Sequence, residues 1–311
     1  MASWERQVGA VLFSAAVLTT SLAQSQSAPL PTKQSNAGDS ISQGAQANSW
    51  LGDHPEYSWV QGTDAAVQSI FTRTRVLQGA LTQEPESVSG AELVGGSDSF
   101  AAQAHRICAQ DLKPDYVALM LGGNDVCHRA SSTSADAAAN LYSVVTWVNG
   151  LRAGLDQLAA CLPHNAAVQL LSVPRVDGLY AAGHAKSFWC GIIVWPAVGI
   201  CRVVTAEKDA GRREQIGMRI NDYNAATAVE AEQYTTNANG KNPSGIRFIS
   251  DWRGSAESGA ANTSIGTYSF GKADINGFDC FHPSVLGQSK IACTAWSSHP
   301  NGSGTAAACL Q

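Results

Sequence analysis

The sequence has 311 residues, 44% of them apolar, which is enough to bury the core of one large domain or two small ones. Only 14% of the residues are charged and the net charge is -5. The chain has no run of Lys or Arg that would attract a phosphate backbone, so we expect no nucleic-acid partner.

The first residues are typical of a secretory signal peptide. An apolar run from Val8 to Leu18 is followed by the small residues Ser21-Leu22-Ala23, where a signal peptidase would cleave. The alternative is a membrane anchor, but a spanning helix needs about 20 apolar residues and this run is shorter. We therefore expect residues 1–23 to be a signal peptide and the mature protein to be secreted, without a stable membrane anchor. Residues 24–37 are rich in Ser, Gln and Pro, and we expect them to form a polar N-terminal linker.

Hydrophobic periodicity predicts alternating helices and strands in the rest of the chain. In chain order, the expected elements are a helix in 63–77, a strand at 116–121, a helix from about 141 to 162, a strand at 167–173, a helix within 207–234, a strand at 246–250 and a helix that runs through Trp296. Such alternation predicts an α/β fold with a mainly parallel central sheet covered on both faces. Functional groups in these sheets gather at the carboxyl ends of the strands.

The cysteine pattern favours disulfides over metal binding. The eight cysteines are Cys108, Cys127, Cys161, Cys190, Cys201, Cys280, Cys293 and Cys309. No two of them form a Cys-x-x-Cys pair, and an even set suits an oxidising compartment. We expect Cys190 to pair with Cys201 across a short loop, while the other connectivities stay open and Cys309 could remain unpaired.

Four short blocks carry the groups that acyl transfer needs. They contain Ser40 in Gly-Asp-Ser, Gly90 in a small-residue turn, Asn124 in Gly-Gly-Asn-Asp, and Asp279 three residues before His282. A serine needs an imidazole to take its proton, the imidazole needs a carboxylate, and the new oxyanion needs N–H donors. Each block alone is more often an ordinary turn or a surface residue. All four in this order favour the catalytic interpretation.

These blocks resemble those of the SGNH hydrolases, also called GDSL esterases and lipases, and the resemblance runs from about Gly38 to Trp296. Gly-Gly-Asn-Asp-Val-Cys and Asp-Cys-Phe-His-Pro-Ser are most similar to secreted, disulfide-bearing lipases and esterases of the phospholipase B and acyloxyacyl hydrolase kind. The resemblance implies a three-layer α/β/α sandwich of flavodoxin-like character over residues 38–299, with 300–311 as a C-terminal tail. It also implies hydrolysis of an ester substrate, lipids included, and no metal or organic cofactor.

The same resemblance implies a role for each site residue. Ser40 would be the nucleophile, His282 the base and Asp279 its orienting acid. The oxyanion hole would consist of the Ser40 and Gly90 N–H groups and the Asn124 side chain.

Two features leave alternatives open. The family normally carries an apolar strand before the nucleophile, whereas residues 32–37 here are polar, so either the first strand is short and polar or this segment has been altered. The fold also serves polysaccharide deacetylases, and a secreted binding protein could keep it without catalysis. Residues 189–201 are unusually apolar and could form a cap that receives an acyl chain or a loop packed on the core.

Overall fold

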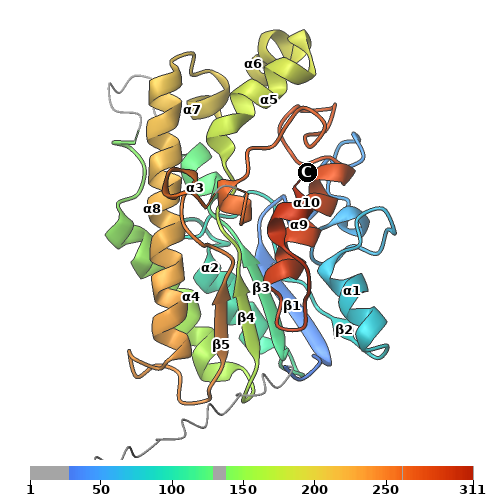
Figure 1. Ribbon diagram of the computed structural model, residues 1–311, viewed down its shortest axis with the longest axis vertical. Helices are drawn as coiled ribbons and strands as arrows, with labels where there is room; N and C mark the ends of the chain where they lie inside the picture. Colours follow the sequence, from blue (N-terminus) through green and yellow to red (C-terminus); the bar gives the residue numbers. More distant parts are fainter. Residues whose placement is uncertain (1–27, 129–137, 261, 311) are drawn as a thin grey trace, which may run out of the picture.

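A computed structural model describes residues 28–128, 138–260 and 262–310. The predicted signal peptide, 1–23, and the first four residues of the predicted linker lie outside these ranges. Five strands form one parallel sheet in the order β2-β1-β3-β4-β5 (Figure 1). They are β1 (Lys33–Gly38), β2 (Thr82–Gln83), β3 (Tyr116–Met120), β4 (Ala167–Leu170) and β5 (Arg247–Ser250). The predicted α/β class with a parallel sheet is confirmed.

Helices cover both faces of the sheet. They are α1 (Ile70–Leu77), α2 (Phe100–Ala109), α3 (Gly123–Cys127), α4 (Val144–Cys161), α5 (Leu179–Lys186), α6 (Trp195–Val198), α7 (Arg202–Thr205), α8 (Ala210–Thr235), α9 (Val285–Ser298) and α10 (Ala306–Cys309). On one face, Phe248 of β5 contacts Tyr234 of α8, and α8 packs on α4 and α4 on α2 (Figure 1). On the other face, Gln169 of β4 donates to the Ala295 carbonyl of α9, beside α1. The three-layer sandwich follows from this arrangement.

Several helix boundaries are set by capping side chains. Ser69, Ser99, Ser143, Asp209 and Ser284 precede α1, α2, α4, α8 and α9, and each accepts a backbone N–H from the first turn of its helix. A cap of this kind satisfies one of the N–H groups that the first turn leaves unpaired. These caps therefore fix the residue at which each of the five helices begins.

The prediction of a polar linker over residues 24–37 was wrong for its last five residues. Lys33 to Gly38 form β1, which lies between β2 and β3 and is buried along its whole length. Its polar side chains are tolerated because each of them donates a hydrogen bond to a neighbouring group, although Gln34 Oε1 has no partner among the described residues. Gln34 donates to the Val60 carbonyl at 3.2 Å, Ser35 to the Glu84 carbonyl at 2.6 Å and Asn36 to the Ser87 hydroxyl at 3.0 Å. A buried polar group costs little once it is hydrogen-bonded, so the strand needs no apolar sequence.

The C-terminal segment is part of the domain, which corrects its description as a tail. Helix α10 packs on α9, and a disulfide joins Cys293 to Cys309. The Leu310 side chain is buried in the core. Residues 300–310 therefore close over the end of α9, and Cys309 is not free.

The expected Cys190–Cys201 pair was also wrong. The four disulfides are Cys108–Cys161, Cys127–Cys201, Cys190–Cys280 and Cys293–Cys309. Residues 190–201 continue through a π-helical turn into α6, which directs the two cysteines to different partners. Proximity in sequence was a poor guide because the intervening residues are helical. Among the described residues, no helix is both long and apolar enough to cross a membrane.

Candidate active site

Ser40 lies in the turn that follows the central strand β1. The Gly38 position tolerates no side chain, because an added Cβ would lie 2.2 Å from the Ser42 hydroxyl oxygen. The Asp39 carboxylate accepts the Ile41 N–H at 2.9 Å, which tightens the turn. Ser40 itself is half-buried at the carboxyl edge of the sheet. The sheet thus fixes the backbone of the turn and leaves the hydroxyl at the surface of a cavity.

The histidine lies on an irregular loop between β5 and α9. His282 Nε2 is 2.8 Å from Ser40 Oγ, and its Nδ1 is 2.5 Å from Asp279 Oδ2. With the ring proton on Nδ1 and donated to Asp279, Nε2 is left to accept the serine hydroxyl. The predicted Ser40, His282 and Asp279 therefore come together, although Ser40 and His282 are 242 positions apart in the sequence. 

The Asp279 carboxylate is ionised in this setting. Burial raises its pKa, but the hydrogen bond to His282 and the imidazole charge lower it, as do the N–H groups of Phe281 and His282, and the pKa ends below its usual value. Those two N–H groups reach Oδ1 at 2.9 and 3.0 Å. Asp279 can therefore hold the His282 ring in one tautomer and stabilise its charged form.

Asn276 was not singled out from the sequence, yet it organises this loop. Its Nδ2 donates to Asp279 Oδ1 at 2.7 Å and to the His282 carbonyl at 2.9 Å. Its Oδ1 accepts the N–H groups of Phe278 and Asp279 at 2.7 and 3.0 Å. The side chain is buried and uses both ends. An Asn three residues before the acid was the available signal, but an isolated Asn in a loop carries little information.

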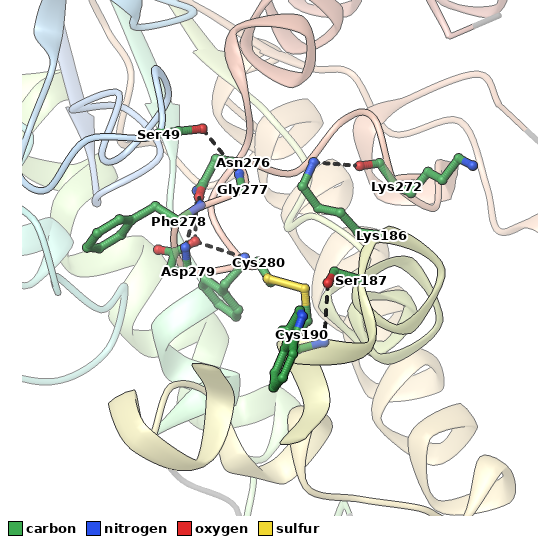
Figure 2. Close-up of a disulfide and its surroundings, with 12 residues drawn as sticks. Ser49, Lys186, Ser187, Cys190, Lys272, Asn276, Gly277, Phe278, Asp279 and Cys280 are labelled. Carbon is green, nitrogen blue, oxygen red and sulfur yellow. Dashed lines mark hydrogen bonds between the residues drawn. A yellow bond between two sulfur atoms is a disulfide. The ribbon is translucent and has the colours of Figure 1, made fainter. Parts of the chain in front are cut away.

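A disulfide ties the same loop to a helical cap, defined here as residues 179–205 (α5 to α7). Figure 2 shows the bond between Cys190, at the start of the π-helical turn, and Cys280, the residue after Asp279. Beside it, Lys186 donates to the Lys272 carbonyl at 3.0 Å, and the Gly277 N–H donates to Ser49 at 3.2 Å (Figure 2). The loop that carries Asp279 is thus held on the cap side by the disulfide and the Lys186 hydrogen bond, and on the other side by the hydrogen bond to Ser49.

The Gly-Gly-Asn-Asp block begins directly after β3. Gly122 has φ +120°, and an added Cβ would lie 2.5 Å from a Val173 methyl group, so only glycine fits there. Asn124 Nδ2 donates to the Ala91 carbonyl at 2.9 Å, which leaves its second N–H hydrogen available. The block therefore places an amide donor at the carboxyl end of a buried strand, as the sequence predicted.

Asp125 holds the segment that follows Gly90. Its two carboxylate oxygens accept the N–H groups of Leu93 and Val94 at 2.7 and 2.9 Å. Burial raises the pKa of Asp125 to about 6, and these N–H groups oppose that effect. Asn124 and Asp125 together therefore attach the Gly90 loop to the end of β3, which brings together blocks that are more than thirty residues apart.

Ser40, Gly90, Asn124 and His282 border one cleft. Within the described residues, no hydrogen-bond acceptor is found for the backbone N–H of Ser40 or of Gly90. Gly90 has φ +86°, which disfavours any other residue. Three N–H donors on separate elements are thus available around the Ser40 hydroxyl. Among all the residues that the structure describes, no cluster of three or more His, Cys, Asp or Glu is placed to hold a metal ion.

The sequence profile of the GDSL-like lipase/acylhydrolase family matches residues 37–289. The chain belongs to this family. Membership supports ester hydrolase activity, and the sequence resemblance to SGNH hydrolases is confirmed. Similar solved structures include a protein from Lactobacillus plantarum, with 18% identity, a TM-score of 0.43 and 85% of this chain and 94% of that chain covered. A candidate GDSL-like lipase from Parabacteroides merdae has 16% identity and a TM-score of 0.38, with 86% and 94% covered. No curated protein matches the chain.

Proposed function

We propose that this member of the family is a secreted serine hydrolase that cleaves carboxylic esters. Ser40 is the nucleophile, His282 the general base and Asp279 the residue that orients it. The observation that carries the proposal is the continuous hydrogen-bonded chain from Ser40 Oγ through both ring nitrogens of His282 to Asp279. This arrangement of a serine hydroxyl on a buried Asp–His pair is the one that a nucleophilic serine requires.

These residues and one water molecule account for every bond and proton in the reaction. The Ser40 oxygen attacks the ester carbonyl while its proton passes to His282 Nε2. The carbonyl oxygen becomes an oxyanion, which the N–H groups of Ser40 and Gly90 and the Asn124 amide can stabilise. When the carbon–oxygen bond to the alcohol breaks, His282 returns the proton to that alcohol. A water molecule then attacks the acyl-enzyme while His282 takes its proton. The carboxylic acid is released when the bond to the Ser40 oxygen breaks and His282 returns the proton to Ser40.

Secretion is part of the proposal. The apolar run from Val8 to Leu18 favours export. All the described cysteines are paired in four disulfides, a state that persists in oxidising compartments.

An inactive binding protein is the less favoured alternative. Its support was the polar segment before Gly38, which could have left Ser40 on a segment outside the sheet. Because residues 33–38 are fully buried in β1, that support is gone.

The experiment is hydrolysis of 4-nitrophenyl esters from acetate to palmitate by the exported protein and its Ser40→Ala and His282→Ala variants. We expect activity in the parent and a loss of about 10⁴-fold or more in both variants, because members of such a triad act as a unit. A matched Ser303→Ala variant, which alters an exposed serine that does not line the cleft, should keep most of the activity. Equal rates in the parent and the Ser40→Ala variant would contradict the proposal.

A further inference from the structure

We propose that the outer face of the cap docks on an anionic lipid surface, such as a bilayer that contains phosphatidylglycerol. This docking face combines exposed apolar side chains with two cationic ones, and its members are Phe188, Trp189, Ile192, Ile193, Arg202 and Lys208. The inference concerns binding to a surface and does not depend on which ester the candidate active site cleaves.

Four large apolar side chains of the docking face form a strip along one helical stretch. Phe188 and Trp189 are 68% and 59% exposed, and Ile192 and Ile193, one turn later, are 53% and 51% exposed. Cys190 lies between the two pairs in sequence, yet it faces inward and is fully buried. Large apolar side chains that gather on one exposed face often mark a surface that binds a protein or a membrane. Trp is favoured at the boundary between lipid and water, where its ring is partly apolar and its N–H stays hydrated.

The docking face lies at an end of the molecule. Figure 1 shows α5 and α6 projecting at the top of the view, beyond the carboxyl ends of the strands. None of the four apolar side chains borders the two cavities that contain Ser40. A broad surface can therefore reach the docking face without entering the candidate active site.

The cap and the rest of the protein carry opposite charge. Residues 179–205 contain Lys186 and Arg202 but no Asp or Glu, so their formal charge is +2, whereas the whole chain carries -5. The other residues therefore carry -7, the difference between these two values. This polarity turns the cap toward a negatively charged surface and the rest of the molecule away from it. A symmetric dimer through the docking face would bring two positive caps together, which argues against a second copy as the occupant.

A cavity beside the apolar strip suits a lipid headgroup. Its volume is about 390 Å³, and its walls include Ile192, Trp195, Arg202 and Lys208. Among the described residues, neither the Arg202 nor the Lys208 side chain has an ion pair or a hydrogen bond. Such cations suit a phosphate group, whose oxygens accept their N–H donors. Because Ile192 is both exposed and on the cavity wall, the cavity adjoins the strip.

The acidic residues next to Lys208 in the sequence are engaged elsewhere. Glu207 forms an ion pair with Arg212 at 3.3 Å. Asp209 caps α8, and its carboxylate accepts the Arg212 N–H at 3.0 Å. Neither acid is paired with Lys208, so this cation stays available to an anion.

The first test is co-sedimentation of the exported protein with vesicles of ether-linked phosphatidylglycerol or ether-linked phosphatidylcholine. Neither lipid has a carboxylic ester, so hydrolysis cannot affect the result. The parent should bind phosphatidylglycerol at least about tenfold more tightly, since each of the two cations strengthens binding to an anionic membrane about fivefold. At about 1 M salt, where the Debye length is about 3 Å, this preference should disappear. No binding to phosphatidylglycerol, or equal binding to both lipids at low salt, overturns the proposal.

The second test removes part of the apolar strip. Trp189→Ser/Ile193→Ser should weaken binding to phosphatidylglycerol vesicles by about tenfold or more, because docking buries both side chains. Val76→Ser/Leu112→Ser is the matched control. Its two side chains are 85% and 62% exposed and precede β2 and β3, at the opposite end of the sheet, so it should bind like the parent. Equal binding by the two double variants would overturn the role of the strip.

The third test removes the two cations. Arg202→Gln/Lys208→Gln should reduce the preference for phosphatidylglycerol by about tenfold or more and leave binding to phosphatidylcholine unchanged. Arg75→Gln/Lys241→Gln removes the same charge near the starts of β2 and β5 and should keep the preference. A preference that survives in the first variant, or falls equally in both, would overturn the assignment of the headgroup cavity.

Other occupants of the docking face give a different result. If the parent ignores vesicles but forms a dimer that Trp189→Ser/Ile193→Ser dissociates, the face is a contact between subunits and the lipid proposal is wrong. Either failure leaves the serine mechanism standing, because hydrolysis of a soluble ester by the Ser40→Ala variant tests that mechanism separately.

Discussion

The two halves of the candidate site are held in different ways. Ser40 follows β1, a strand with neighbours on both sides, so its position is set by the backbone hydrogen bonds of the sheet. The Asp279–His282 loop belongs to no sheet ladder, and the buried Asn276, one disulfide and a hydrogen bond to Ser49 hold it instead. We therefore expect changes near Ser40 to affect the stability of the whole domain. Changes around His282 should affect activity more than stability.

Removing the Cys190–Cys280 disulfide is the largest expected perturbation of the loop. The bond closes a segment of 90 residues, and its loss from a Cys190→Ser/Cys280→Ser variant should lower the free energy of unfolding by about 2–5 kcal/mol. Because Cys280 adjoins Asp279, kcat should fall as well. Urea unfolding and ester hydrolysis measure the two effects.

The Cys293–Cys309 disulfide is a matched control. It closes only 16 residues and lies away from the site, so a Cys293→Ser/Cys309→Ser variant should lose less stability and keep its kcat. If the two double variants lost kcat equally, the idea that the cap disulfide holds the histidine loop would be wrong.

The pH dependence of stability at Asp39, the residue before Ser40, tests how the turn after β1 is held. Burial raises the pKa of Asp39 from 3.8 to about 6, while the Ile41 N–H and His282 oppose the rise. A raised folded-state pKa gives stability that is full below pH 3.8 and is lost as the pH rises through about 6. The contribution of Asp39 to the free energy of unfolding should therefore fall by up to about 3 kcal/mol between pH 4 and 7.

The measurement is the difference in unfolding free energy between the parent and Asp39→Asn at these two pH values. The advantage of the parent over Asp39→Asn should shrink as the pH rises, because the amide does not titrate. An advantage that grows with pH would show that Asp39 is ionised at little cost in the folded protein.

The activity of Asn276 variants tests how the Asp279–His282 loop is held. Asn276→Ala removes the donor to Asp279 Oδ1 and should lower kcat by about 10²-fold, in the range seen when a residue that orients a catalytic group is lost. Asn276→Asp places a second carboxylate beside Asp279 and should move the acid limb of the kcat/KM profile to higher pH. A purely structural role would leave the position of that limb unchanged.

Asn242 provides the control for a buried Asn with comparable bonds. Its Nδ2 donates to the carbonyls of Tyr234 and Ile246 at 2.8 and 2.6 Å, before β5 and away from the site. Asn242→Ala should lose stability like Asn276→Ala but keep its kcat and its pH profile. Similar losses of kcat in both would refute a positioning role for Asn276.

Asn36 gives the smallest expected effect, on stability alone. Asn36→Ala removes the 3.0 Å hydrogen bond to Ser87 inside the sheet and should lower the free energy of unfolding by about 1–3 kcal/mol. The exposed Asn140→Ala is the control and should change stability by no more than about 0.5 kcal/mol. Equal stability of the two variants would mean that the polar side chains of β1 do not stabilise the strand.

The difference between the two halves also explains what the sequence could predict. The apolar runs that became β3, β4 and β5 were recognisable because strands buried on both faces are usually apolar. Strand β1 was missed because its stability depends on partners such as Val60, Glu84 and Ser87, whose proximity no local pattern reveals. The partner of Cys190 was likewise predicted wrongly because the residues between Cys190 and Cys201 are mostly helical.

The site residues could be predicted better than the groups that hold them. Ser40, Gly90, Asn124, Asp279 and His282 were selected by residue type and order, and the structure brings all five to one region. Asn276 and Asp125 were not assigned a role, because hydrogen bonds to backbone groups leave no distinctive mark in a single sequence. The chemistry of the site was therefore easier to predict than its support.

The most direct test of the serine mechanism is mass spectrometry of the exported, disulfide-bonded protein after reaction with a fluorophosphonate. The account predicts one adduct, located on Ser40, that forms slowly or not at all in His282→Ala and is absent from Ser40→Ala. An adduct on another residue, or no adduct on the folded parent, would contradict the assignment of Ser40 as the nucleophile.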